Sequence, residues 1–306
     1  MIELATVFLE AAVRGATPLA FAAIGETVTE RAGVINIGLE GMIIAGAFGA
    51  AAGALVIGPI GGYGAAVGAG SVMAALFAVF TVRWRTDQII TGTAVTVGAL
   101  GLTAMLYRTM FGAGGVALSV PTTPPVALPL LSQIPLLGRP FFVQPPVTYV
   151  AYLAVALAWW FLFRTRRGLA LRAAGEAPVA VLAAGHSPAR LRTLAILIGG
   201  AMGGLGGASI VLAQVGTFAE GMSAGRGFIA LAIVALGRWH PIGAAGAALL
   251  FGGAIALQHL AQAAAVRLPY QAFLALPYLL TLFALAGGAG RRHAPAALGR
   301  PLPTLE

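Results

Sequence analysis

The stretch Thr29–Phe48, TERAGVINIGLEGMIIAGAF, combines strongly apolar residues with features that an ordinary membrane-spanning helix lacks. Four glycines lie in it, together with Asn36 and Glu40. Ionisable residues at membrane depth are costly, and clustered glycines let a helix break or approach another helix closely. A broken helix near the membrane midplane presents backbone donors and acceptors to a substrate. The stretch therefore predicts a broken helix beside a substrate path, unless Glu40 lies near the membrane surface and pairs with Arg31.

Apolar segments almost free of charge continue on both sides of this stretch. Of 306 residues, 59% are apolar and 9% are charged, and the mean hydropathy is +0.93. A soluble domain carries roughly 25% charged residues. Because about 20 apolar residues cross the hydrocarbon core as a helix, we predict an all-α polytopic transmembrane helical bundle of about 8–10 spans, forming a single domain over residues 1–290. The predicted spans are 4–25, 34–57, 62–82, 89–111, 147–164, 191–213, 227–238, 242–263 and 269–288.

The basic residues mark one side of the membrane. All eighteen are arginines; six fall between Arg164 and Arg192, and pairs occur at Arg83/Arg85 and Arg291/Arg292. Short loops rich in arginine face the cytoplasm. The distribution places the loop 165–190 and the tail 291–306 inside, and the N-terminus and the loop 112–146 outside. It gives no indication of nucleic-acid binding.

The outside loop 112–146 is rich in proline, including Pro121, Pro124–Pro125 and Pro145–Pro146. Proline at this density prevents a long helix and favours an extended connection. The loop is either a docking surface for an extracytoplasmic partner or a plain connector.

The inside loop 165–190 contains a short amphipathic stretch, Glu176–Ala184. Pro178 fits the first turn of a helix, and Gly185 fits the position just after its end. A small helix outside the membrane needs a surface to pack on. We expect a cytoplasmic partner there, although its own loops or the lipid headgroups are alternatives.

A second interrupted segment spans Gly216–His240. Its apolar core, Gly227–Gly237, is too short to cross a bilayer as one helix, and glycines precede it. Glu220 and Arg226 flank the glycine-rich bend and could simply pair with each other. The two interrupted segments occupy comparable places in the two halves of the chain, which points toward a substrate path between them.

Signatures of an enzyme or a metal site are missing from the sequence. The four histidines do not fall at metal-ligand spacing with each other or with carboxylates, and the chain contains no cysteine. No P-loop occurs, since the glycine run 199–207 lacks the following Gly-Lys-Ser/Thr; it is better interpreted as a helix-packing face. Any ATP that drives this chain must be hydrolysed by a different one.

Four collinear blocks resemble the permeases of bacterial ABC importers for branched-chain amino acids, simple sugars and nucleosides, and the first resembles the nucleoside branch in particular. The blocks are NIGLEGM (Asn36–Met42) within Gly33–Ala50, TDQIITG (Thr86–Gly92), GLALRAAGEAP (Gly168–Pro178) within the loop Thr165–Gly185, and AGRGFIALA (Ala224–Ala232). The loop 112–146 and the tail after Arg291 carry no such likeness.

The resemblance implies a permease of two related halves in the bacterial inner membrane, with a second permease subunit, often a paralogue, beside it. It also implies cytoplasmic ATPase subunits that bind ATP and Mg, and an extracytoplasmic substrate-binding lipoprotein. This chain would bind no cofactor of its own. The coupling helix that meets the ATPase would comprise Glu176, Ala177, Pro178, Val181, Gly185 and His186.

The expected cargo is a nucleoside, a neutral polar solute that suits a path with few fixed charges. The residues expected to line or gate the path are Asn36, Glu40, Gly41, Gln88, Glu220, Arg226 and Phe228. A simple sugar or a branched-chain amino acid is the alternative cargo. A transporter driven by protons or sodium, with Glu40 as the coupling carboxylate, is the alternative mechanism.

Overall fold

The computed structural model describes residues 2–112, 118–263, 275, 279, 282 and 294–302. In this part of the chain almost all regular structure is helical, and the two-residue strands β1 (Val126–Ala127) and β2 (Val143–Gln144) form one antiparallel pair. Within the described residues, six helices are long and apolar enough to cross a membrane. The helices are α1 (Ile2–Arg31), α2 (Leu39–Ala78), α3 (Gln88–Phe111), α4 (Gly138–Phe142), α5 (Pro146–Arg164), α6 (Arg166–Glu176), α7 (Pro178–Ala183), α8 (Pro188–Ile210), α9 (Arg226–Leu236) and α10 (Pro241–Ala263).

Helix α2 folds back on itself. Ile57 and Gly58 leave helical geometry, with φ 74° and ψ 178° at Gly58, and Pro59 starts the second arm. Backbone torsions of this kind are open to glycine and to almost no other residue. The two arms lie antiparallel, because a Cβ at Gly53 would come within 2.6 Å of the Ala65 Cβ. The predicted spans 34–57 and 62–82 are therefore confirmed as separate segments, although the first begins as a helix only at Leu39.

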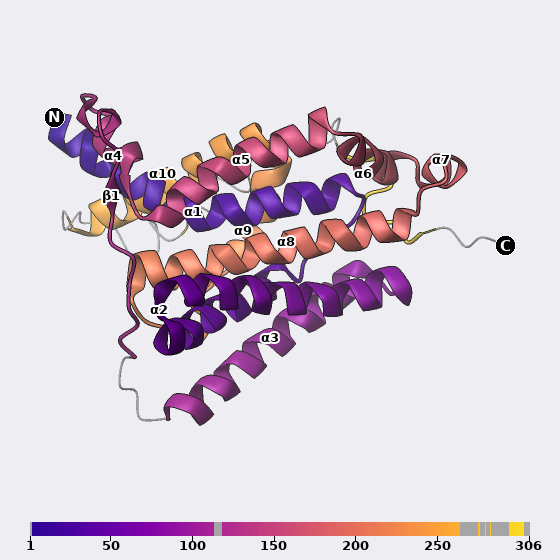
Figure 1. The fold of residues 1–306 in the computed structure, drawn as a ribbon, viewed down its shortest axis with the longest axis horizontal. Helices are drawn as coiled ribbons and strands as arrows, with labels where there is room; N and C mark the ends of the chain where they lie inside the picture. Colours follow the sequence, from indigo (N-terminus) through magenta and orange to yellow (C-terminus); the bar gives the residue numbers. More distant parts are fainter. Residues whose placement is uncertain are drawn as a thin grey trace.

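Helix α8 lies at the centre of the bundle and packs against α2 and α1 (Figure 1). Its glycines make the contact close: a Cβ at Gly46 would lie 2.4 Å from the Gly204 Cα, and one at Gly70 would lie 2.2 Å from the Gly200 carbonyl oxygen. Small residues let helix backbones meet in this way. The prediction that 199–207 is a packing face is confirmed.

The other predicted spans agree with helices to within a few residues. Span 4–25 lies in the longer α1, 89–111 is α3, 147–164 is α5, 191–213 is α8 with the π-helical continuation η3 (Val211–Val215), 227–238 is α9 and 242–263 is α10. A second π-helical turn, η1 (Val79–Arg83), extends α2, and a 3-10 turn, η2 (Leu131–Gln133), lies in the loop 112–146. Span 269–288, needed for the predicted total, lies outside the described residues, as do Arg291 and Arg292 of the tail.

The elements outside the long helices gather at opposite ends of the bundle. Figure 1 shows the N-terminus with α4 and β1 at one end, and α6, α7 and the C-terminal segment at the other. Helix α3 packs on α2 and η1 and diverges from the rest of the bundle toward its C-terminal end. The described part of the loop 112–146 and the loop 165–190 therefore lie at opposite ends of the bundle, in agreement with the arginine distribution.

Candidate functional site

The chain between α1 and α2 turns back into the bundle without forming a helix. Helix α1 ends at Arg31 and α2 begins at Leu39, so residues 32–38, the re-entrant segment, connect them as irregular backbone. Gly33 makes the turn with φ +90°. Irregular backbone at membrane depth is tolerated only where protein or a water-filled cavity satisfies its polar groups. The predicted break within Thr29–Phe48 is confirmed.

Buried side chains satisfy the backbone of the re-entrant segment. The Ile35 amide donates to Gln88 Oε1 at 2.9 Å, and the Asn36 amide donates to Glu26 Oε1 at 2.9 Å. The Thr96 hydroxyl donates to the carbonyl oxygen of residue 37 at 3.2 Å. Gln88, Asn36 and Glu26 are all at most 5% exposed. Helix α1 and helix α3 therefore hold the segment from two sides.

Glu40 joins the two interrupted helices at their N-termini. Its carboxylate accepts from the amide of Gly225, the N-cap residue of α9, at 2.8 Å and from the amide of Gly227, in the first turn of α9, at 2.6 Å. Glu40 itself lies in the first turn of α2. Helix N-termini carry partial positive charge, so one buried carboxylate stabilises the ends of both helices. We call Glu40, Gly225 and Gly227 the N-terminal junction.

The junction leaves no room for larger side chains. A Cβ at Gly227 would lie 2.5 Å from the Glu40 amide nitrogen, and a Cβ at Gly41 would lie 2.9 Å from the Thr96 Cα on α3. Only glycine permits contacts of this closeness at the two positions. The segments that the sequence places in comparable positions of the two halves meet directly here.

Two polar atoms next to the junction are buried without a hydrogen-bond partner in the described part of the chain. They are Asn36 Oδ1, four residues before Glu40, and Ser223 Oγ, two residues before Gly225. The Asn36 amide group donates to the Met42 sulfur at 3.3 Å, a weak acceptor. Buried polar groups normally have partners. Uncharged groups of this kind can hydrogen-bond a neutral polar solute.

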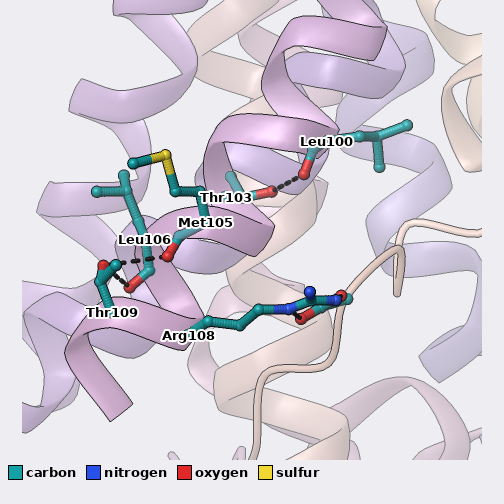
Figure 2. A network of polar contacts seen from close by, with 7 residues as sticks. Leu100, Thr103, Met105, Leu106, Arg108 and Thr109 are labelled. Atoms are coloured by element: carbon teal, nitrogen blue, oxygen red, sulfur yellow. Dashed lines mark hydrogen bonds and ion pairs between the residues drawn. The ribbon is translucent and has the colours of Figure 1, made fainter. Parts of the chain in front are cut away.

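Of the remaining predicted path residues, Glu220 lies in the loop before α9, and Arg226 and Phe228 lie in the first turn of α9. Glu220 forms a two-bond ion pair with Arg108 of α3, at 2.7 and 2.8 Å, and Figure 2 shows Arg108 extending from α3 toward this contact. Hydrogen bonding to Arg108 lowers the pKa of the Glu220 carboxyl. The Arg226 guanidinium donates to the carbonyl oxygen of Ser223 at 3.1 Å, and Phe228 is 49% exposed.

Two alternative pairings considered from the sequence are wrong. Glu40 does not pair with Arg31, whose Nε donates instead to the Trp239 carbonyl oxygen at 2.8 Å. Glu220 pairs with Arg108 rather than with Arg226, because α3 brings an arginine against the loop from outside the segment. Local spacing suggested partners six to nine residues away, whereas the fold supplied partners more than a hundred residues away.

A groove in the described part of the chain lies away from the junction. An open groove of about 690 Å³ runs between the second arm of α2 and α3, and its lining is apolar apart from Thr86, Asp87 and Thr91. None of the seven predicted path residues lines it. In the described residues the junction is therefore a packed contact rather than a cavity.

Sequence reasoning missed a buried acidic pair on α1. Glu26 and Glu30, one helical turn apart on α1, are both at most 5% exposed. Glu26 binds the re-entrant segment, and Glu30 accepts a hydrogen bond from the Trp239 indole in the turn after α9. The sequence does contain a pattern that indicates the pair, because two carboxylates four residues apart follow the first apolar run. The pair was missed because the predicted span ended at residue 25.

Helix α7 projects from the end of the bundle (Figure 1). It begins at Pro178 and is followed by Gly185 with φ +78°, so both predicted boundary residues have the expected roles. The His186 amide donates to the Val181 carbonyl oxygen at 3.0 Å, and the Gly185 amide donates to the carbonyl oxygen of residue 182 at 2.9 Å. These two bonds form a Schellman motif, which fixes the end of the helix.

The predicted helix Glu176–Ala184 starts two residues too early. Glu176 is the last residue of α6, and Ala177, with φ −144° and ψ 78°, breaks the chain between α6 and α7. Val181 faces the protein and is 4% exposed, whereas Val179 is 65% exposed at the projecting tip. Val179 is therefore accessible to another protein at the tip of α7.

Membrane-length helices, two interrupted helices that meet at their N-termini and a short helix at one end of the bundle are the features of a multi-pass membrane protein. The chain belongs to the family described as "Branched-chain amino acid transport system / permease component", whose model matches residues 8–285. The chain is 36% identical to the guanosine ABC transporter permease protein NupQ of Bacillus subtilis, over 98% of both chains.

Two further relatives cover most of the chain. It is 36% identical to the nucleoside ABC transporter permease protein NupC of Lactococcus lactis, over 92% of both chains. It is 37% identical to the putative glucose ABC transporter permease protein TsgC13 of Haloferax volcanii, over 87% of this chain and 81% of the relative. No solved structure matches the chain.

Proposed function

We propose that this chain is the membrane-spanning permease subunit of an ATP-driven ABC importer that translocates nucleosides. The main support is the likeness, over 98% of both chains, to a guanosine ABC transporter permease, together with a second nucleoside permease relative. The uncharged, unpartnered polar atoms of Asn36 and Ser223 beside the N-terminal junction agree with a neutral polar cargo.

The path would run beside the N-terminal junction. Asn36, Glu40, Gly41 and Gln88 lie together there, on or against the re-entrant segment. Glu220, Arg226 and Phe228 would act at the approach to the path, on the loop before α9 and its first turn. A second permease subunit would complete the path, because the junction is packed shut within the described chain.

ATP hydrolysis on the partner subunits would drive transport, and the loop 165–190 would transmit its movement to the spans. Helix α7 would insert into the ATPase subunit, with Glu176, Ala177, Pro178, Val181, Gly185 and His186 forming and fixing the inserted segment. ATP and Mg would bind the ATPase subunit and not this chain. The exposed Val179 side chain supports a protein contact at the tip.

Permeases of this class act together with ATPase and substrate-binding subunits. For this chain we infer two ATPase subunits, a second permease that is a paralogue, and a substrate-binding lipoprotein that docks at the loop 112–146. The proposed location is the bacterial inner membrane, where lipid surrounds the helices. The tail 291–306 and α7 would face the cytoplasm, and the N-terminus would face outward.

A simple sugar is the second candidate cargo, because a putative glucose permease is also similar to the chain. The ion-coupled alternative gains no support from the geometry. Both oxygens of the Glu40 carboxylate accept hydrogen bonds from backbone amides, so that group is engaged in holding two helices together.

Uptake by cells tests the proposed cargo. The chain would be expressed with its partner subunits in a strain that lacks its own nucleoside uptake, and radiolabelled guanosine uptake would be measured against competing glucose, leucine and other nucleosides. We expect saturable guanosine uptake that nucleosides compete for and glucose and leucine do not. Competition by glucose alone would assign the sugar, and competition by leucine alone would assign the amino acid.

A further inference from the structure

The C-terminal segment 294–302, predicted only as a tail, is bound into the end of the bundle. The Ala297 amide donates to the Gly175 carbonyl oxygen at 2.8 Å, and the Gly299 amide donates to the Gly33 carbonyl oxygen at 3.2 Å. It therefore bridges the last turn of α6 and the start of the re-entrant segment. We call residues 294–302 the C-terminal strap.

Arg192 of α8 fixes the strap to the same place. Its guanidinium donates to the carbonyl oxygens of Ala32 at 3.2 Å, Arg300 at 2.8 Å and Ala297 at 3.4 Å. Arg192 is 2% exposed, and all three of these bonds within the described chain go to backbone carbonyls. Burying a charge is costly, and the rigid fork of guanidinium donors suits several carbonyls at once.

The strap also reaches the residue that precedes the projecting helix. Glu176, which ends α6 one residue before the break to α7, accepts from the Ala296 amide at 3.0 Å. Its neighbour Gly175 packs directly on α1, since a Cβ there would lie 2.3 Å from the Arg31 carbonyl oxygen. The loop that carries α7 thus contacts the end of α1 both directly and through the strap.

The two contacts transmit different movements. Close packing of Gly175 on Arg31 resists compression, because atoms cannot overlap, but it resists separation only weakly. Hydrogen bonds from the strap and Arg192 hold the same elements when the loop moves away from α1. Arg31 extends the connection further, since it donates to the carbonyl oxygen of Trp239 in the turn that follows α9.

We propose that the C-terminal strap, positioned by Arg192, transmits displacement of the α6–α7 loop to the re-entrant segment in both directions. The strap binds the loop at Gly175 and Glu176, and the re-entrant segment at Gly33. Arg192 binds the strap and Ala32 together. The proposal rests on the proposed function, because it assumes that an ATPase moves the loop. Arg192 is a positioning residue and contacts no substrate.

The test measures ATP hydrolysed per guanosine imported by the complete transporter in proteoliposomes. The variants are Arg192→Gln, Arg192→Lys and a chain truncated after residue 293. The matched control is Arg300→Gln, because that exposed arginine contributes its backbone carbonyl to the strap contact. Thermal stability of the assembled complex is measured for each.

We expect Arg192→Gln and the truncation to keep ATPase activity while uptake falls about tenfold, the size of a typical coupling between two sites. The ratio of ATP to guanosine then rises by the same factor. Arg192→Lys should recover part of the uptake, and Arg300→Gln should match the wild type.

An unchanged ratio in Arg192→Gln and in the truncated chain overturns the proposal. Equal losses of ATPase activity and uptake would show that the strap contributes only to folding, and so would failure of both variants to assemble. Either result also overturns the proposal. Absence of ATP-dependent uptake in the wild-type complex is a different result, and it contradicts the proposed function itself.

Discussion

Replacement of Glu40 by glutamine tests whether its carboxylate holds the two interrupted helices together. The variant keeps the size of the side chain but has one acceptor oxygen instead of two. One of the two amides, Gly225 or Gly227, then faces an NH₂ group. Leaving a buried donor without its partner costs about 1–3 kcal/mol, and more when the lost partner was charged. We therefore expect a destabilisation of about 2–4 kcal/mol.

The assay is thermal unfolding of the detergent-solubilised chain, followed by tryptophan fluorescence. A loss of this size lowers Tm by roughly 5–10 °C for a chain of a few hundred residues. Glu40→Ala removes both acceptor oxygens, so the Tm of this variant should be lower than that of Glu40→Gln. Glu3→Gln, at an exposed position of α1, is the control for loss of one negative charge and should leave Tm within about 1 °C.

An unchanged Tm in Glu40→Gln would contradict this expectation. It would mean that the amides of α9 find other partners and that the carboxylate is not what joins α2 to α9. An equal decrease in Glu3→Gln would show that net charge, and not the junction, sets the stability.

Three further predictions concern the N-terminal junction, helix α7 and the loop before α9. Gly227→Ala should destabilise the chain by about 1–3 kcal/mol through overpacking against Glu40, whereas Gly246→Ala, with open space around it, should leave Tm equal or slightly higher. Val179→Asp should leave Tm unchanged but lower ATP-driven uptake about tenfold, a loss of ~1.4 kcal/mol at the ATPase contact. Uptake equal to that of the wild type would show that α7 does not contact the ATPase. Arg108→Gln should speed hydrogen exchange in the loop 216–225 at neutral pH. The pKa of the Glu220 carboxyl is lowered in the folded chain, so the ion pair should protect the loop amides of the wild type from exchange at every pH above 4.5, the ordinary pKa of this carboxyl. As the pH falls further and Glu220 is protonated, the exchange rate of the wild type should approach that of the variant. Exchange that is the same in the wild type and in Arg108→Gln at neutral pH would contradict the ion pair.

The sequence was sufficient for the helices because burial in lipid imposes a simple pattern. A helix must satisfy its backbone internally, so apolar length locates it, as α3 and α10 illustrate. Proline and glycine gave the ends of α7 for a similar local reason, since Pro178 and Gly185 act through their own backbone torsions. The break at residues 32–38 was predictable from glycines beside Asn36 and Glu40.

Contacts between distant segments could not be derived in the same way. Glu40 is 185 positions from its partner Gly225, and Arg108 is 112 positions from Glu220. Spacing along one helix supplies no information on such pairs, so nearby residues were considered as partners instead. The strap was missed because residues 294–302 carry no apolar periodicity; their backbone amides and carbonyls make most of the contacts, and these are the same for every sequence.

Transport in proteoliposomes most directly tests the claim that this chain is the permease of an ATP-driven nucleoside importer. Vesicles containing the chain with its partner permease, ATPase and binding protein would receive labelled guanosine outside, with ATP enclosed or omitted. We expect guanosine accumulation that requires both enclosed ATP and the ATPase subunit. Guanosine uptake by this chain alone, driven by a proton or sodium gradient and lost in Glu40→Gln, would contradict it.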